Sequence, residues 1–150
     1  MAIEFSDIVV RLLAATAVGL ILGINRELKD KPAGLRTHAI VALGSAIITL
    51  LSVLPPSDGT SASRALQGVI TGIGFLGAGV ILRTQAGSVH GLTTAATIWL
   101  AAAFGAACGL GYWSVAAVAS AIALLILILG VSFERQLKRV QNDDDDGSDR

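Results

Sequence analysis

Charged side chains are scarce through the middle of this 150-residue sequence. No aspartate or glutamate lies between Asp58 and Glu134, and the only lysine or arginine residues in that stretch are Arg64 and Arg83. Over the whole chain 15% of residues are charged and 53% are hydrophobic, whereas typical soluble domains have about 25% charged residues. The composition excludes an ordinary soluble domain and predicts a protein embedded in the lipid bilayer.

Cysteine is also nearly absent, since Cys108 is the only one. A single cysteine excludes an internal disulfide and a zinc site built from cysteines. No carboxylate lies inside any long apolar stretch, and magnesium usually requires one or two carboxylates among its oxygen ligands. We therefore expect no metal site, no cofactor and no nucleic-acid partner.

Five apolar stretches approach the roughly 20 residues that a helix needs to cross a bilayer core of about 30 Å. They cover residues 8–25, 38–54, 66–82, 92–108 and 114–133, with Thr37 as a plausible N-cap for the second. The first stretch lacks the basic start of a signal peptide, so we expect it to remain in the mature protein. We predict an all-α, polytopic membrane bundle of about five transmembrane helices over residues 1–139, followed by a disordered acidic tail over residues 140–150.

Basic residues collect at alternate breaks between the apolar stretches. Such residues in short loops are retained on the cytoplasmic side of the membrane. The breaks after the first and third stretches, and the segment after the fifth, hold Arg26, Lys29, Lys31, Arg36, Arg83, Arg135, Lys138 and Arg139. We therefore predict an N-terminus outside and a C-terminus in the cytoplasm. Near the start of the first stretch, Arg11 is expected to pair with Asp7 one helical turn earlier.

Residues 72–77 formally match the dinucleotide fingerprint G-x-G-x-x-G. That fingerprint requires a preceding strand and an acidic residue about 20 positions later. Here the match lies inside an apolar stretch, and no acidic residue lies near Thr97. We therefore reject a soluble nucleotide-binding enzyme.

Glycine has a second use in membranes, because it allows helices to approach closely. The first and fourth stretches carry the G-x-x-x-G spacing, the latter at Gly105 and Gly109. The third stretch has glycines on two faces and is expected to lie wedged between neighbouring helices. Helix-packing roles are predicted for Gly19, Gly23, Gly68, Gly72, Gly74, Gly77 and Gly79. The alternative is a broken helix whose carbonyl groups bind an ion, as in many transporters.

Polar residues at the predicted cytoplasmic side form two groups. The start of the fourth stretch carries Thr93, Thr94 and Thr97, which could cap the helix and bond to a neighbouring helix, or could bind a ligand. The second group is Asn25, Arg26, Glu27, Arg36, Thr37, His38, Arg83 and His90. These residues could be solvated anchors at the headgroup level. Together they could instead form a pocket for an anion, since arginines beside a helix N-terminus attract phosphate or carboxylate groups.

Three long motifs occur in the order typical of the MgtC/SapB family: PAGLRTH at residues 32–38, GIGFLGAG at 72–79 and GLTTAATIW at 91–99. The chain resembles this family over residues 8–133. Many members carry an acid where this chain has Asn25, and better-studied members add a soluble C-terminal domain. We expect this chain to be a short form without that domain.

The resemblance implies a multi-pass protein of the bacterial inner membrane, linked to growth in low magnesium and, in some pathogens, to survival inside host cells. Members were once taken for magnesium transporters. The resemblance favours instead a non-enzymatic regulator of other membrane proteins, including ATP synthase and cation-transport ATPases. Our hypothesis is such a regulator, with a cytoplasmic site at Arg26, Glu27, Arg36, Thr37 and His38. Whether it acts as a single chain or as a homo-oligomer is left open by the sequence. The alternative is a channel or transporter for magnesium or another cation, formed by the glycine-rich helices with Thr93, Thr94 and Thr97 as ligands.

Overall fold

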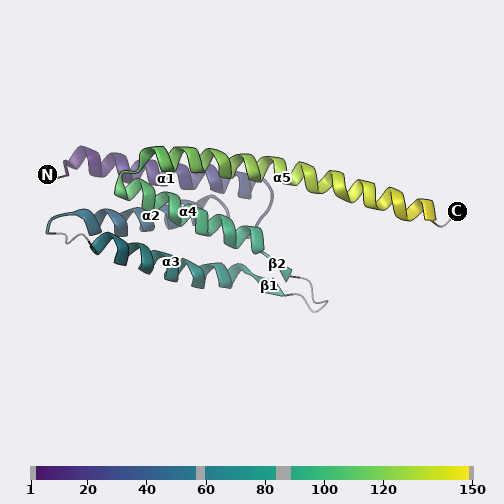
Figure 1. The fold of residues 1–150 in the computed structure, drawn as a ribbon, viewed down its shortest axis with the longest axis horizontal. Helices are drawn as coiled ribbons and strands as arrows, with labels where there is room; N and C mark the ends of the chain where they lie inside the picture. Colours follow the sequence, from purple (N-terminus) through teal and green to yellow (C-terminus); the bar gives the residue numbers. More distant parts are fainter. Residues whose placement is uncertain (1–2, 57–59, 84–88, 149–150) are drawn as a thin grey trace.

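The described residues form five helices that lie side by side and alternate in direction, as Figure 1 shows for this computed structural model. They are α1 (Phe5–Glu27), α2 (Leu35–Val53), α3 (Ser61–Val80), α4 (Leu92–Leu110) and α5 (Trp113–Ser148). The structure describes residues 3–56, 60–83 and 89–148, and the side chains of these except residues 82, 83 and 131–148. The predicted all-α fold is confirmed.

Among the described residues, four helical segments are long and apolar enough to span a membrane: Phe5–Glu27, Leu35–Val53, Leu92–Leu110 and Trp113–Gly130. The chain is therefore a multi-pass membrane protein. The remaining helix, α3, has 20 residues and lies alongside the bundle, but Arg64 and Gln67 make its first half more polar. The side of the membrane that each terminus faces stays a prediction.

Two short features differ from the sequence expectation. Strands β1 (Leu82–Arg83) and β2 (Val89–His90) pair antiparallel before α4, where no strand was predicted. Helix α5 continues as helical backbone to Ser148, whereas a disordered tail was predicted from residue 140. The side chains beyond Gly130 lie outside the described residues, so the boundary at residue 140 stays a prediction.

The core lies between α1, α2 and α4, with α4 the most buried helix. Small residues allow these helices to approach closely. A Cβ added at Gly105 of α4 would lie 2.7 Å from the Cα of Ala42 on α2. One added at Gly19 of α1 would lie 2.8 Å from the Cα of Ala39. Real Cβ atoms do not approach so closely, so the backbones of these helices are in near-direct contact.

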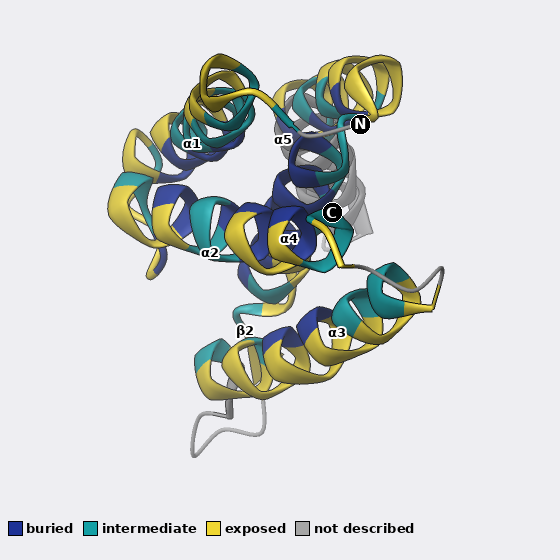
Figure 2. Ribbon diagram, turned by 90° about the vertical axis from the view of Figure 1, so that its left-hand side faces the viewer, coloured by how far each residue is buried: buried dark blue, intermediate teal, exposed yellow. Residues whose placement is uncertain are grey.

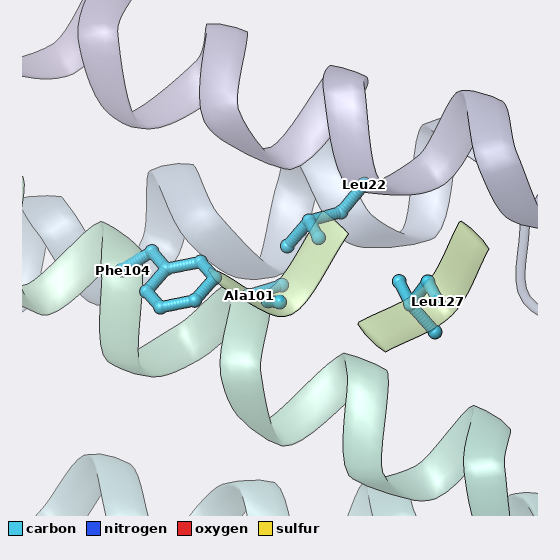
Figure 3. Close-up of a cluster of buried hydrophobic side chains, with 5 residues drawn as sticks. Leu22, Ala101, Phe104 and Leu127 are labelled. Atoms are coloured by element: carbon cyan, nitrogen blue, oxygen red, sulfur yellow. The ribbon is translucent and has the colours of Figure 1, made fainter. Parts of the chain in front are cut away.

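Larger side chains fill the space between this core and α5. Leu22 of α1 points toward Ala101 and Phe104 of α4, and Leu127 of α5 lies beside them (Figure 3). Leu22 and Ala101 are completely buried. This cluster closes one side of the bundle, while the outer surfaces of the helices keep large apolar side chains exposed, as a lipid environment requires.

Helix α3 packs on the bundle along one side only. Its buried residues are Val69 and Ile73, which contact Ile98 and Ala102 of α4, and most of its surface is exposed (Figure 2). A Cβ added at Gly77 would meet only the Ala95 side chain, at 3.7 Å. The other α3 glycines with predicted packing roles have no heavy atom within 4 Å of an added Cβ: Gly68, Gly72, Gly74 and Gly79.

Within this chain, α3 is therefore not wedged between neighbouring helices through these glycines, contrary to the prediction. The reason lies in the helical period of about 100° per residue. Val69 and Ile73 share the inner face, whereas Gly68, Gly72 and Gly79 lie on a different face, about 100° away round the helix.

Candidate functional site

Polar side chains from three helices are buried together at the end of the bundle where α1 ends and α2 and α4 begin. We call this end the basic end, because Arg26, Lys29, Lys31 and Arg36 lie there. The buried members are Arg26 at 4% exposure, His38 at 0%, Thr94 at 2% and Thr97 at 1%. We call these four residues the polar cluster. Burial of polar groups at this depth is costly unless hydrogen bonds satisfy them.

Hydrogen bonds link the polar cluster across all three helices. Arg26 Nη2 donates to Thr94 Oγ1 at 2.7 Å, which joins α1 to α4. His38 Nε2 lies 3.1 Å from Thr97 Oγ1, which joins α2 to α4. The Thr97 hydroxyl also lies 2.9 Å from the Thr94 carbonyl oxygen. The cluster thus locks the mutual rotation of α1, α2 and α4 at this end.

The protons of His38 follow from its partners. Its Nδ1 lies 2.9 Å from the carbonyl oxygen of Gly34, and because a carbonyl only accepts, Nδ1 carries a proton. Nε2 then faces the one hydroxyl proton of Thr97, which can go to Nε2 or to the Thr94 carbonyl. The ring is therefore a structural bridge between α2 and α4.

Glu27 has a different role from the buried cluster. Its carboxylate accepts the backbone N–H of Leu35 at 3.1 Å and so satisfies one N–H in the first turn of α2. This contact explains why α2 begins at Leu35, with Gly34 as its N-cap. The N-cap predicted at Thr37 is therefore wrong by three residues, since the helix begins after Gly34 and its cap comes from the neighbouring helix.

The remaining predicted site residues lie outside the cluster. Arg36 and Thr37 are exposed on the first turn of α2, and Thr93 is exposed at the start of α4. The side chain of Arg83 lies outside the described residues. The structure thus brings together Arg26, His38, Thr94 and Thr97, and leaves Arg36, Thr37 and Thr93 at the surface of the same end.

The opposite end of the bundle carries a second polar lock. Arg11 pairs with Asp7, with Nη2 2.8 Å from Asp7 Oδ2, which confirms the predicted pair. Its Nη1 also donates to the carbonyl oxygen of Gly109 at 2.9 Å, near the C-terminus of α4. A cation at this position offsets the unpaired carbonyl groups that end a helix. Gly111 ends α4 with φ 80°, a conformation that glycine adopts readily.

Two features of the site carried no sequence signal. Asn25 Oδ1 and Arg26 Nε are buried without a hydrogen-bond partner among the described residues. The second feature is the Gly34 carbonyl oxygen, which accepts from His38 Nδ1 only because α2 starts at Leu35.

No group of three His, Cys, Asp or Glu side chains that could hold a metal ion occurs within the part of the chain that the structure describes. The polar cluster contains the Arg26 guanidinium, an imidazole and two hydroxyls but no carboxylate, and a guanidinium attracts an anion and repels a cation.

Comparison with known proteins finds one family and several relatives of this chain. The model of the MgtC family matches residues 12–136. Protein SrpB of Synechococcus elongatus is 43% identical over 129 residues, covering 78% of this chain and 71% of SrpB. Protein MgtC of Salmonella typhimurium is 44% identical over 121 residues, covering 81% of this chain and 51% of MgtC. Protein SapB of Bacillus subtilis is 37% identical over 134 residues, covering 85% of this chain and 56% of SapB. The match thus spans only about half the length of MgtC and SapB. No solved structure is significantly similar.

Proposed function

The chain belongs to the MgtC family, and we propose that it is a non-enzymatic regulator that docks, through α3, against a larger transport protein of the bacterial inner membrane. The family resemblance supports a setting in magnesium or proton homeostasis during growth at low magnesium. It also suggests ATP synthase or a cation-transport ATPase as the class of partner.

The observation that carries the docking step is the uncovered glycine face of α3. An added Cβ at Gly68, Gly72 or Gly79 meets no heavy atom within 4 Å. In lipid, helices associate through close packing rather than through burial of apolar surface, since lipid tails are as apolar as leucine. A face of this kind lets the backbone of a foreign helix approach as closely as α2 approaches α4. Phe75 is 81% exposed on the same helix and offers such a partner a large side chain.

The packing of the core supports a role as a regulator and not as an ion transporter. Thr94 and Thr97, the ligands that an ion pathway would use, already bond to Arg26 and His38. A magnesium ion at Thr94 would lie beside the Arg26 guanidinium, and two positive charges in a medium of low dielectric repel strongly. The channel or transporter alternative is therefore disfavoured at this position.

The test is site-specific photocrosslinking in native membranes of magnesium-starved cells. A photoreactive residue replaces Phe75 on α3, or Ile40 on α2, which is 69% exposed and serves as the control. We expect the probe at position 75 to capture a transport protein and the probe at position 40 to capture none. The further change Gly72→Leu should abolish capture from position 75 while the protein remains folded.

Two outcomes would overturn the proposal. Capture of only a second copy of this chain from position 75 would make α3 a self-association surface. Passage of magnesium, potassium or protons through liposomes that contain the purified protein would favour the channel or transporter instead.

A further inference from the structure

A cleft of about 700 Å³ opens at the basic end, beside the polar cluster. Its walls come from the loop after α1, the start of α4 and the middle of α5. Figure 1 shows the loop after α1 and the start of α4 at the same end of the bundle. Residues 26, 28–32, 90, 91, 93, 94, 126, 127 and 130 line it. The cleft includes Arg26 and His90 from the predicted anion pocket, and Thr93 and Thr94 from the start of α4. It does not include Arg36, Thr37 or His38.

Arg26 lines this cleft and carries an unsatisfied donor. The side chain is 4% exposed, and its Nη2 is held by Thr94, while Nε has no partner among the described residues. A buried N–H without an acceptor costs roughly 1–3 kcal/mol, and more when the group is charged. An oxyanion that enters from the cleft and reaches this N–H would remove that cost, because a guanidinium binds phosphate through two parallel N–H groups.

The start of α4 adds a second set of donors to the same cleft. Helix α4 has 19 residues and begins after Gly91, which has no side chain that could cap it. The N–H groups of its first turn point toward this end, and the helix dipole makes the end partly positive. Gly91, Thr93 and Thr94 all line the cleft. The N-terminus of a helix of this length, next to an arginine, suits an anion.

The charges and walls of the cleft define the class of anion. Among the described residues that line the cleft, three side chains are cationic, Arg26, Lys29 and Lys31, and one, Asp30, is a carboxylate. The Lys29 ammonium also donates to the Leu127 carbonyl oxygen at 3.0 Å. The apolar part of the wall contains Leu28 and Ile126, which are 80% and 65% exposed and continue onto the surface that lipid covers. An amphiphile with a phosphate head and an acyl chain along α5 matches both parts.

We propose that this cleft binds a phosphate group, with Arg26 and the first turn of α4 as donors and Lys29 and Lys31 as the surrounding charge. The phosphate can belong to an anionic phospholipid or to a soluble phosphate compound. The apolar wall favours the phospholipid. This proposal is independent of docking through α3.

The test measures binding by the purified full chain in detergent micelles. One arm titrates phosphatidylglycerol and counts bound lipid by native mass spectrometry, with phosphatidylcholine as the neutral lipid. The other arm titrates inorganic phosphate and follows its ³¹P resonance. Lipid binding that phosphate does not displace identifies the phospholipid as the source, and saturable phosphate binding without lipid identifies the soluble source.

Matched variants separate the cleft from the general positive charge of this end. Arg26→Lys keeps the positive charge but removes the paired N–H groups of the guanidinium, and should weaken phosphate or lipid binding by about tenfold. Lys31→Gln, at an exposed wall residue, should weaken it by about threefold. Arg36→Gln removes the same charge outside the cleft and should change binding by less than about 1.5-fold.

Equal losses in Lys31→Gln and Arg36→Gln would overturn the proposal, because they would reflect surface charge alone. Preference for neither phosphatidylglycerol nor phosphate would also overturn it. If Arg26→Lys does not fold, the comparison of Lys31→Gln with Arg36→Gln decides the question, since both residues are exposed.

Discussion

The glycines of α1 and α4 and those of α3 follow similar spacings, yet they lie in opposite surroundings. Gly19 and Gly105 sit where an added Cβ would strike the backbone of α2, whereas Gly72 has nothing within 4 Å of it. The difference comes from position in the bundle, since α4 lies against α1, α2 and α3, and α3 touches the bundle along one side (Figure 2). Glycine spacing therefore shows that close approach is possible, while the arrangement of the helices decides whether it occurs inside the chain.

The same division holds for polar side chains. Hydroxyls of α4 bond to other helices, since Thr94 Oγ1 accepts from Arg26 of α1 at 2.7 Å and Thr97 Oγ1 lies 3.1 Å from His38 Nε2 of α2. On α3, the Thr71 hydroxyl donates to the carbonyl oxygen of Gln67 in its own helix, at 2.9 Å. The central helices form a locked unit, and α3 presents its surface outward.

The largest effect is expected from Gly105→Leu. The new side chain would strike α2, where even a Cβ would lie 2.7 Å from the Ala42 Cα, so α2 and α4 must separate. We expect the free energy of unfolding to fall by about 3 kcal/mol or more, measured by circular dichroism during titration with sodium dodecyl sulfate. In the control, Gly72→Leu, the change should stay within about 0.5 kcal/mol. Similar losses in both variants would mean that α3 is packed as tightly as α4.

Much of this arrangement could be predicted from the sequence, because long apolar stretches and their Pro and Gly breaks depend only on local composition. Arg26, His38, Thr94 and Thr97 could each be selected as unusual polar residues for the same reason. Their meeting in one cluster could not be predicted, since it depends on which faces of α1, α2 and α4 turn inward. A single sequence carries the period of each helix but not its rotation relative to its neighbours.

The next largest effect is expected from His38→Phe. The ring is fully buried and bridges Gly34 and Thr97, so its loss breaks one part-buried and one buried hydrogen bond. We expect a loss of about 2 kcal/mol in the free energy of unfolding, measured in the same detergent titration. Thr71→Val on α3 removes one hydrogen bond within a single exposed helix and should cost less than about 0.5 kcal/mol. If Thr71→Val costs as much as His38→Phe, the polar cluster has no special structural role.

A smaller effect is expected from Arg11→Met at the opposite end. This change removes the pair with Asp7 and the donor to the Gly109 carbonyl oxygen, while the hydrophobic stem is kept. A partly buried cation at a helix C-terminus contributes about 1 kcal/mol, and we expect that loss in the unfolding titration. Arg64→Gln, at an exposed position on α3, is the matched control and should have no measurable effect. Equal effects would show that Arg11 acts only through the charge of the protein surface.

The smallest effect is expected from Gly72→Ala, and its sign is opposite to that of the others. The position is helical and the added Cβ meets no neighbouring atom, so the main consequence is a less flexible unfolded chain. We expect the free energy of unfolding to rise by about 0.5 kcal/mol. Gly105→Ala, the same chemical change on α4, should lower it because the Ala42 backbone occupies the space. If both alanine variants destabilise the isolated protein, then a surface within the chain must cover the α3 glycines, and α3 could no longer offer that face to a partner.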